Sequence, residues 1–555
     1  MDKYLVTSAL PYANGRLHIG HVAGAYLPAD IYVRFLRLNN RDVVYVCGTD
    51  EHGAPISIRA EAENKTPQQV VDYFHENIKD SFDALNIKFD NFSGTSRPEH
   101  HKLAQEFFLN LLKDKKINTK ITKQSFCEHD NRFLPDRYVE GECPSCHAHG
   151  ARGDQCDACG KLIDALQLIN PKCMICGNAP VIRETMHWFL DLPAFENQLT
   201  EWLENKPNWK DNVVKFILSW IKEGLQERSI TRDINWGVPV PLENAENKVL
   251  YVWFDAPIGY ISSTIEWSKK IGQPDKWKDY WLNKNTKLVH FIGKDNIPFH
   301  AIIWPTLLMG QEKKYCLPYD IPANEYLTLE GEKISTSRNF AIWVDEFIKY
   351  FDAELLRFVL AANAPESKDS DFTWKDFQNV VNNSLANVLG NLANRVFSFA
   401  KKHFNGVLNQ PTKADYMADT FPLLPSQASE IHIAFSEFKV RKAVKSIIDL
   451  ARDGNKFFDE AKPWVSIKED TKKAEGDIYV CCNLLRIISV IFCPVMPESM
   501  KKLRKMMKLT DDFTWEEINK NPEKITIGDF EPLFKKVEDK EVEQQLTLLS
   551  TGGKC

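Results

Sequence analysis

The chain has 555 residues, of which 43% are apolar and 26% charged, and a formal net charge of −6 at pH 7. This length is more than one hydrophobic core supports, so we expect about three to five domains. The acidic balance excludes a protein that coats nucleic acid with positive charge over its whole surface, although a local basic face would still bind nucleic acid.

Three apolar runs predict parallel β-strands. They lie at 4–10, 42–53 and 287–300, and each leads into polar, glycine-containing residues and then a helical pattern. Nearly continuous apolar strands that alternate with helices are typical of a doubly wound, Rossmann-like α/β sheet. Ligands of such sheets lie beyond the carboxyl ends of the strands, so we expect the polar residues after these runs to form one site.

A pair of histidines follows the first predicted strand. Gly15 permits a tight turn and a helix is expected to begin near His18, which places His18 and His21 on one helix face. The N–H groups and positive dipole end of a helix attract anions, and imidazole donors there suit the phosphates of a nucleotide. Taken alone, the short pattern is explained equally well by one core and one surface histidine.

Changes of pattern along the chain predict where one domain gives way to another. A segment rich in Cys, Gly, Asp and Pro interrupts the strand–helix alternation and indicates an insertion. Further on, apolar residues recur every three or four positions at 377–404 and 431–464, which indicates a helical bundle. The expected parts are a Rossmann-like sheet domain in two halves at 1–117 and 233–323, an inserted connective domain at 118–232, a linking region at 324–376, the helical bundle at 377–540 and a C-terminal tail at 541–555.

Six of the thirteen cysteines form three C-x2-C pairs. Without a secretory leader this spacing favours metal ligands in a reducing, cytoplasmic compartment over disulfides. Two pairs separated by nine residues predict a closed, structural zinc site with four thiolates. These ligands are Cys143, Cys146, Cys156 and Cys159.

The third pair, Cys173 and Cys176, has fewer partners. Upstream there is only Cys127 with His129 or Asp130, so the fourth ligand would not be a cysteine. A second zinc site and a site that has lost its metal remain open alternatives. The number of zinc equivalents per chain separates them.

A polar stretch at 325–338, "EYLTLEGEKISTSR", changes the interpretation of the histidine pair. Its Lys333, Ser335, Thr336 and Ser337 form a loop whose lysine would close over a pyrophosphate leaving group. The alternative is an ordinary polar turn. The two stretches on opposite sides of a parallel sheet are much more specific than either one alone.

The most apolar segment, 479–497, bears on membrane attachment. Asn483 and Arg486 interrupt it and prolines end it. We therefore interpret it as a buried helix of the bundle rather than a membrane span, and we expect no membrane partner.

At this point the chain resembles the class I aminoacyl-tRNA synthetases. His18-Ile19-Gly20-His21 matches their "HIGH" motif, and "KISTS" matches their "KMSKS" loop. "ALPYANG", "GTDEHG", "VWFDAPIGY" and "FIGKDN" are similar to the methionyl-tRNA synthetase family, and the similarity runs along almost the whole chain. One position departs: Thr336 stands where the family loop has its second lysine. This leaves Lys333 as the candidate cation for pyrophosphate, with Arg338 or Lys294 as helpers.

The resemblance implies an enzyme that joins L-methionine to ATP and transfers the acyl group to the 3′-terminal adenosine of tRNA(Met), with Mg²⁺ accompanying ATP. An aromatic and aliphatic pocket suits a thioether, and a carboxylate suits the substrate ammonium. The implied catalytic residues are His18, His21 and Lys333. The implied ATP-binding residues are His18, Gly20, His21, Gly293, Asp295, Lys333 and Thr336. The implied methionine-binding residues are Leu10, Tyr12, Asp50, Trp253, Ala256, Pro257, Tyr260 and His300. The implied anticodon-reading residues are Asn391, Arg395 and Trp464.

Two other functions are weighed against this one. A small-molecule nucleotidyltransferase also uses an H-x-G-H pair, but it has no use for a long helical bundle or a zinc insertion. A non-catalytic tRNA-binding protein is disfavoured by intact His18, His21, Asp50 and Lys333. Many relatives continue into a small β-barrel that dimerises, and its absence here leads us to expect a monomer.

Overall fold

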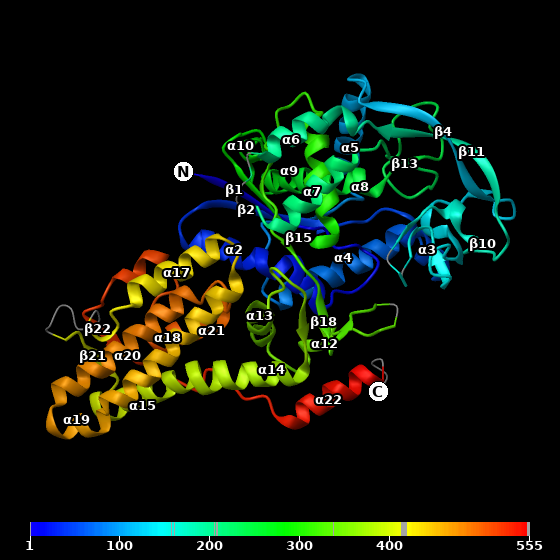
Figure 1. Cartoon of the computed structure of the whole chain (residues 1–555). Helices are drawn as coiled ribbons and strands as arrows, with labels where there is room; N and C mark the ends of the chain where they lie inside the picture. The colour runs from blue at the N-terminus through cyan, green and yellow to red at the C-terminus, as the bar shows by residue number, and fades with distance from the viewer. Residues whose placement is uncertain are drawn as a thin grey trace.

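A computed structural model describes residues 2–156, 158–159, 161–204, 206, 209–336, 338–411 and 419–551. Ser337 of the predicted lysine loop and residues 552–555 of the predicted tail lie outside the described residues. Figure 1 shows two lobes, one built around a sheet and one made of long helices, with a thin arm extending from the first.

A six-stranded parallel sheet forms the centre of the N-terminal lobe. Its order is β16-β15-β1-β2-β3, with β17 paired to β15. The bounds are β1 (Lys3–Ser8), β2 (Asp42–Thr49), β3 (Asn91–Gly94), β15 (Lys287–Gly293), β16 (Pro318–Asp320) and β17 (Ala323–Asn324). After β1 the chain adds β2 and β3 on one side of this strand, and later it adds β15 and β16 on the other side. The strand order therefore reverses between β1 and β15. The predicted doubly wound fold class is confirmed, and its ligand crevice lies at the carboxyl ends of these two strands.

Helices cover both faces of the sheet. In β1, Tyr4 and Val6 pack into one apolar cluster and Leu5 into another, because successive strand residues point to opposite faces. Burial on both sides explains the nearly continuous apolar sequence of the strands. The covering helices are α2 (Leu27–Leu38) and α4 (Pro67–Ala84) on one face, and α5 (Pro98–Lys113) and α9 (Gly259–Lys270) on the other. Shorter helices of this lobe are α3 (Ala54–Ala62), α8 (Val252–Asp255), α10 (Lys278–Trp281), α11 (Trp304–Met309), α12 (Val344–Phe347) and α13 (Ala353–Ala362).

An antiparallel arm leaves the lobe after α5. Its strands β4 (Ile117–Cys127) and β11 (Val181–Leu190) pair along the whole length of β11, and Figure 1 shows them reaching away from the sheet. The segment between them holds the cysteine loops on short strands. These are β5 (Arg132–Phe133), β6 (Val139–Glu142), β7 (His149–Arg152), β8 (Asp154–Gln155), β9 (Leu162–Ile163) and β10 (Ile169–Cys173).

Beyond the arm, the chain returns to the sheet. Helices α6 (Glu196–Glu204) and α7 (Asp211–Glu223) bury Leu199 and Ile217 in the same cluster as Leu5. This part of the predicted insertion therefore shares a core with the sheet. Three short strands follow: β12 (Arg228–Ser229), β13 (Thr231–Arg232) and β14 (Val249–Leu250).

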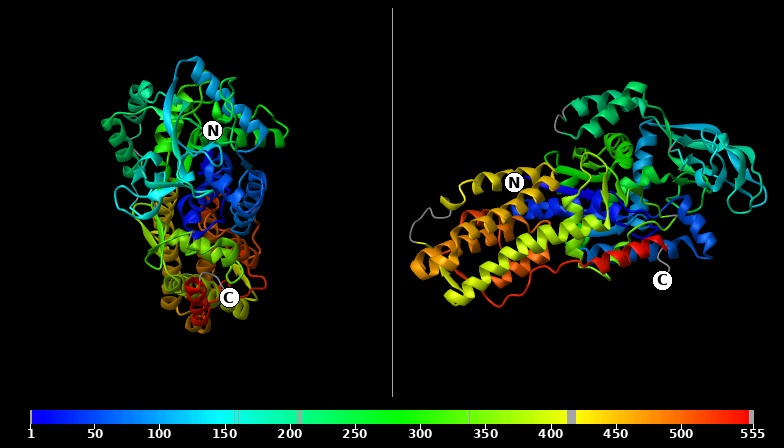
Figure 2. Two further views of the ribbon diagram at one scale, coloured as in Figure 1. Left: turned by 90° about the vertical axis from the view of Figure 1, so that its right-hand side faces the viewer. Right: turned by 60° about the horizontal axis from the view of Figure 1, so that its bottom comes forward.

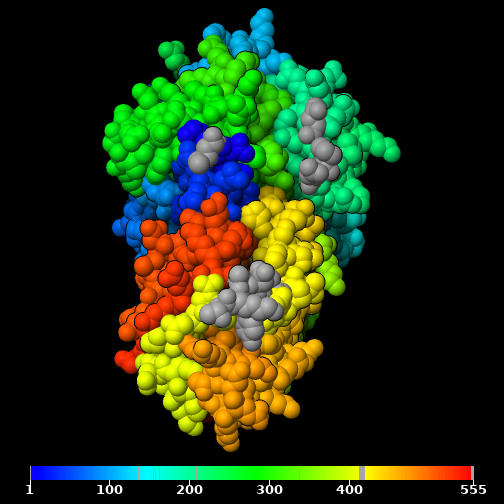
Figure 3. Space-filling model, turned by 90° about the vertical axis from the view of Figure 1, so that its left-hand side faces the viewer, coloured from blue at the N-terminus to red at the C-terminus, as the bar shows by residue number. Residues whose placement is uncertain are grey.

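The C-terminal lobe is a helical bundle, seen lengthwise in Figure 2. Figure 3 shows its helices directly beside the N-terminal segment, where Tyr32 of α2 meets Phe438 with ring centroids 4.8 Å apart. The described helices are α14 (Trp374–Val380), which continues through a π-helical segment (Val381–Gly390) into α15 (Asn391–Phe404), then α17 (Leu424–Ser436), α18 (Val440–Ala461), α19 (Pro463–Glu469), α20 (Thr471–Ile491), α21 (Pro497–Met506) and α22 (Asp539–Ser550).

Two left-handed residues divide the predicted helical stretch 431–464. Phe438 has φ +60° between α17 and α18, and Lys462 has φ +46° between α18 and α19. Pro463 then fits the first position of α19, where a missing N–H costs nothing. Neither Phe438 nor Lys462 is a glycine or asparagine, so residue type did not mark these breaks.

The predicted buried helix within 479–497 is confirmed as part of α20. Its polar residues Asn483 and Arg486 are buried but bonded: Arg486 Nε donates to Asn483 Oδ1 at 2.7 Å, and its Nη1 donates to Glu517 O at 2.9 Å. Among the described helices, none combines the length and the apolar character that crossing a bilayer requires.

Candidate active site

Two stacked imidazoles lie where β1 gives way to its helix. His18 is the N-cap of α1 (Ile19–His21), and its Nδ1 accepts from Gly20 N at 3.2 Å. His21 Nδ1 lies 3.3 Å from His18 N, and the two ring centroids are 3.6 Å apart. Because each Nδ1 accepts a hydrogen bond, the neutral rings carry their proton on Nε2. Burial and the neighbouring His21 hold the pKa of His18 well below its usual value, so it stays neutral and offers an Nε2–H donor.

Gly20 is required between the two histidines. A Cβ at this position would lie 3.0 Å from two atoms of the His18 ring and 3.1 Å from Ile334. Any larger residue would therefore displace the imidazole that caps the helix. Packing, rather than an unusual backbone angle, explains the glycine of this motif.

A cavity of about 680 Å³ opens at the carboxyl ends of β1 and β15. It lies at the point where strand order reverses, as the fold requires. Its wall brings together residues that the sequence predicted from segments far apart. These are Leu10, Tyr12, His18, Gly20, His21, Asp50, Trp253, Gly293, Asp295 and Lys333.

Asp50 follows β2 and is 7% exposed. Its Oδ1 is buried and has no hydrogen-bond partner among the described residues. Burial and the nearby Asp255 carboxylate raise the pKa of Asp50 well above its usual range. An unpaired buried carboxylate is costly, so this position suits a ligand that brings a positive charge.

The aromatic wall beside Asp50 is built in two layers. Trp253 lines the cavity and stacks on Phe299, with ring centroids 3.5 Å apart and planes at 6°. Four predicted methionine-binding residues lie in the buried layer behind it and do not line this cavity. They are Ala256, Pro257, Tyr260 and His300.

The buried layer is held by a polar bond. Tyr260 Oη lies 2.7 Å from His300 Nε2, and His300 Nδ1 donates to Asn296 O at 3.1 Å. Burial lowers the pKa of His300 to about 4, so the ring is neutral and its Nε2 accepts from the tyrosine. Leu10 packs on this layer: a Cβ placed at Gly259, the neighbour of Tyr260, would lie 3.4 Å from the Leu10 side chain.

The lysine loop is a hairpin of β18 (Leu327–Leu329) and β19 (Glu332–Lys333). Lys333 lines the cavity, and its ammonium lies 5.8 Å from the centre of the Tyr326 ring. In the described part of the chain Lys333 makes no ion pair. Thr336 does not line this cavity but a neighbouring one, beside Arg16.

The two other candidate cations are already paired. Lys294 Nζ lies 2.8 Å from Glu325 and 2.9 Å from Asp369, while Arg338 lies 3.5 Å from Glu332. Neither lines the cavity. Lys333 is therefore the candidate best placed to meet a phosphate.

An arginine clasp that the sequence did not reveal joins the histidine turn to the segment after the lysine loop. Arg16 pairs with Asp345 at 2.5 Å and Glu346 at 2.7 Å, and its guanidinium lies 4.9 Å above the Trp343 ring. The backbone of His18 bridges to that of Trp343. The partners are 329 residues apart, so no local pattern indicates the contact. A second missed contact joins Tyr326 Oη to Asp295.

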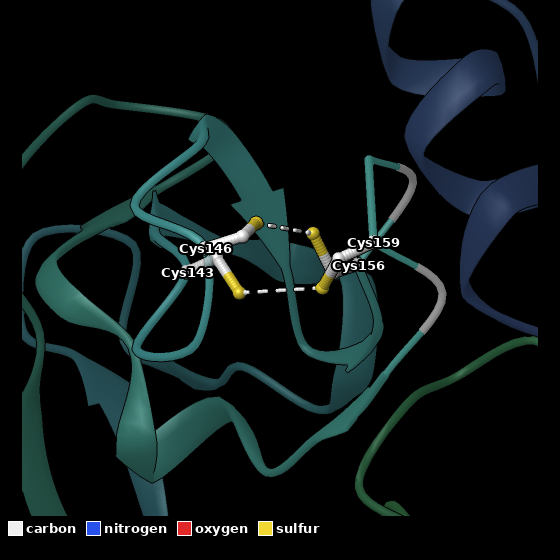
Figure 4. A group of neighbouring side chains, drawn as sticks. All are labelled: Cys143, Cys146, Cys156 and Cys159. Atoms are coloured by element: carbon white, nitrogen blue, oxygen red, sulfur yellow. Dashed lines mark hydrogen bonds between the residues drawn. The ribbon is translucent and has the colours of Figure 1, made fainter.

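The first cysteine cluster has the geometry of a zinc site. In Figure 4 its four thiols converge, with Sγ–Sγ distances of 3.9 Å between Cys143 and Cys159 and 3.7 Å between Cys146 and Cys156. Zn–S bonds of about 2.3 Å in a tetrahedron require sulfur atoms about 3.8 Å apart. The four predicted ligands therefore fit zinc without rearrangement.

The second cluster gathers around a carboxylate. Cys127 Sγ and Cys173 Sγ each lie 3.2 Å from Asp130 Oδ2, and Cys127 lies 3.4 Å from Cys176. His129 is exposed and bonds only the outer oxygen of Asp130, at 2.9 Å. Of the two candidate fourth ligands, Asp130 thus lies with the thiols. Three thiolates and one carboxylate are an acceptable zinc donor set.

The predicted anticodon residues meet at the far end of the bundle. Asn391 and Arg395 of α15 face α18, where Asn391 Nδ2 donates to Asn455 Oδ1 at 3.1 Å and Arg395 pairs with Asp459. Trp464 lies in the first turn of α19 and is 46% exposed. Arg395 and Trp464 flank the same ring, Phe458, at 4.4 and 6.2 Å from its centre.

The doubly wound sheet, the capped imidazole pair at its switch point and the facing lysine hairpin together define a class I aminoacyl-tRNA synthetase. Family models agree: "tRNA synthetases class I (M)" matches residues 4–397, and "Anticodon binding domain of methionyl tRNA ligase" matches residues 416–551.

Individual proteins narrow the class. The chain is 47% identical to a methionine--tRNA ligase of Pyrococcus furiosus over 98% of this chain and 76% of that protein. It is 46% identical to a methionine--tRNA ligase of Rubrobacter xylanophilus over 99% of this chain and 98% of that protein. A solved Mycobacterium tuberculosis methionyl-tRNA synthetase in complex with methionyl-adenylate matches with 26% identity and a TM-score of 0.80, over 96% of this chain and 100% of that one. The chain belongs to the methionyl-tRNA synthetase family, as its motifs indicated.

Proposed function

We propose that the cavity at the switch point joins methionine to ATP, and that the resulting methionyl group passes to the 3′-terminal adenosine of a methionine tRNA. The activity follows from the family, and one observation carries its assignment to this cavity. Two Nε2–H donors, a carboxylate oxygen (Asp50 Oδ1) with no hydrogen-bond partner among the described residues and a lysine with no ion pair among them line the same space. The solved relative in complex with methionyl-adenylate supports the assignment.

In the activation step, the methionine carboxylate attacks the α-phosphorus of ATP and pyrophosphate leaves. The Nε2–H groups of His18 and His21 stabilise the charge that builds on the α-phosphate oxygens. Lys333 meets the departing pyrophosphate. Gly293 and Asp295 hold the nucleotide on the β15 side, where a Cβ at Gly293 would meet open space. The chain itself forms no covalent bond to the substrate; it positions and stabilises.

The same cavity selects the amino acid. Asp50 receives the α-ammonium group in a charge-assisted hydrogen bond. Leu10, Tyr12 and Trp253 contact the side chain, whose sulfur packs well at aromatic edges. Ala256, Pro257, Tyr260 and His300 shape this wall from behind.

Metal ions have separate roles. The cysteine clusters would hold two structural zinc ions, one on four thiolates and one on three thiolates and Asp130. Mg²⁺ would enter with ATP, bound largely by phosphate oxygens. The acidic groups Glu325 and Asp369, which line the cavity, both accept from Lys294.

The far end of the bundle reads the anticodon. Unstacked bases are recognised by aromatic stacking and by hydrogen bonds to their edges, which suits exposed Trp464 beside Asn391 and Arg395. Trp464→Ala should lower the efficiency of tRNA charging about tenfold. Pyrophosphate exchange without tRNA should stay at the wild-type rate, since Trp464 lies in the other lobe. A matched fall in both assays would contradict this role.

Pyrophosphate exchange measured with each proteinogenic amino acid, with and without tRNA, tests the proposal. Exchange with methionine alone, independent of tRNA, is the expected result. Exchange with no amino acid would favour a protein that only binds tRNA. Adenylyl transfer to a small molecule that is not an amino acid would favour a nucleotidyltransferase.

A further inference from the structure

A buried cluster of ionisable side chains lies behind the amino-acid end of the cavity and has no role in the assignments above. His52 follows β2, His100 lies in the first turn of α5, and Asp255 ends α8. Their exposed fractions are 1%, 0% and 0%. In Figure 1 α5 and α8 lie next to each other in the sheet lobe.

Asp255 is the centre of this cluster. Its Oδ2 lies 2.6 Å from His52 Nδ1 and 3.4 Å from His100 Nε2. An ionised carboxylate only accepts, so both imidazoles donate to it. The outer ring nitrogens are also engaged: His52 Nε2 lies 3.2 Å from His101 Nε2, and His100 Nδ1 lies 3.1 Å from Ser262 Oγ. The hydrogen bonds therefore form one connected network.

Two members of the cluster, His52 and Asp255, lie next to residues of the methionine site, and His100 is connected to it through Asp255. Asp50 stands two residues before His52, and Asp255 stands two residues after Trp253. The backbone oxygen of His52 accepts from Tyr12 Oη at 2.6 Å. The cluster thus joins three walls of the cavity that come from separate segments of the chain.

The cluster also distinguishes two neighbouring carboxylates by their partners. Asp50 Oδ1 and Asp255 Oδ1 are both buried without a hydrogen-bond partner among the described residues. His52 and His100 help to hold the pKa of Asp255 below its usual value, and the charge of Asp255 in turn raises the pKa of Asp50. Asp255 is engaged by imidazoles, and Asp50 is left for a cation.

We propose that His52, His100 and Asp255 are positioning residues for methionine binding: they fix the Asp50 loop against the helix that carries Trp253. The proposal rests on the methionine site described above. None of the three residues lines the cavity. It acts on the ammonium contact through Asp50 and on the side-chain contact through Trp253.

Kinetics of pyrophosphate exchange test this role, because a positioning residue should change one substrate constant. His100→Leu removes the bond to Asp255 and should raise the KM for methionine about tenfold. His100→Gln places an amide donor where Nε2 was, and it should restore most of the affinity. The KM for ATP should match wild type in both. His432→Gln, a half-buried histidine on Asn39 away from the cavity, is the matched control.

Asp255→Asn supplies the second measurement and should raise the KM for methionine in the same way. If it melts below the assay temperature, His52→Asn replaces it, since its amide retains a donor near the Nδ1 position and should leave the KM close to wild type while His52→Leu raises it. A folded His100→Leu or Asp255→Asn with wild-type KM for methionine overturns the proposal. So do equal rises for methionine and ATP, which indicate general loosening.

Asp50→Asn, measured alongside, separates the two levels of inference. If it leaves the KM for methionine unchanged, the methionine site itself is misassigned. If it raises this KM while the cluster variants do not, only the positioning role fails.

Discussion

The cavity and the cysteine arm build their sites in opposite ways. The cavity collects side chains from as far apart as Leu10 and Lys333, and it lies between two large apolar clusters that cover the sheet. The arm takes the ligands of its first cluster from Cys143 to Cys159, and its apolar cluster is small. Cysteines form much of that cluster.

The side chains of the cavity and those of the cysteine arm therefore have different roles. Groups in the cavity are held by the core around them, so removing one should change the reaction and leave the fold intact. The metal ligands on the arm supplement its small core, so removing one should change local stability and leave the reaction intact. Four experiments, from the largest expected effect to the smallest, test this contrast.

The largest effect is expected at His18. His18→Asn keeps an acceptor near the Nδ1 position that caps the helix but loses the Nε2–H donor. The rate of pyrophosphate exchange should fall by about 10²–10³ while the melting temperature stays close to wild type. His18→Gln reaches the Nε2 position and should retain more activity. A large loss of melting temperature in His18→Asn would break the contrast, because the cavity residue would then be structural.

Lys333 should come next. Of the three candidates Lys333, Arg338 and Lys294, Lys333→Ala removes the one that lines the cavity, and exchange should slow by about tenfold to a hundredfold. Arg338→Ala is the control, because Arg338 pairs with Glu332 outside the cavity. Equal losses in both variants would show that the loop as a whole, rather than this ammonium, serves the pyrophosphate.

Metal content tests what is expected of the cysteine arm. The purified chain should carry two zinc equivalents, and Asp130→Ala should carry one. Methionine-dependent exchange should remain at the wild-type rate in this variant, because no arm cysteine lines the cavity. Limited proteolysis should instead cut the arm faster. One equivalent in both proteins would show that the second cluster holds no zinc.

The smallest effect is a dependence of stability on pH from the buried histidines behind the cavity. His290 Nε2 accepts from Trp304 Nε1 at 3.1 Å, and burial holds the pKa of His290 well below 6.5 and that of His300 at about 4. The unfolded chain therefore binds more protons below pH 6.5, and the free energy of unfolding should fall as pH drops toward 4. Each ring contributes at most about 1.4 kcal/mol per pH unit.

Urea unfolding at several pH values between 7.5 and 5 measures that slope. His300→Gln should reduce it, since glutamine does not titrate. A slope that His300→Gln leaves unchanged would assign the effect to other groups.

Short motifs made part of this structure predictable. A strand followed by His18 and His21, and cysteines at fixed spacing, depend on contacts within a few residues. The pairing of His52 with Asp255 joins positions 203 residues apart, and no local pattern encodes it. Sequence identified Tyr260 and His300 with the pocket, but only packing decides that they form its second layer.

The fourth ligand of the second cysteine cluster shows, at a single position, what residue types alone do not predict. His129 and Asp130 are neighbours and both bind metals, so composition does not choose between them. The local turn decides between them. Asp130 N donates to Cys127 Sγ at 3.4 Å, and this contact directs the Asp130 carboxylate toward the thiols. A single backbone contact thus fixes what the residue types left open.

The Arg16 clasp has a mechanical consequence. Because Arg16 pairs with Asp345 and Glu346, the turn that precedes His18 is held against α12, the helix that follows the lysine loop in the chain. A shift of the histidine turn relative to α12 would break both ion pairs and would separate the Arg16 guanidinium from the Trp343 ring.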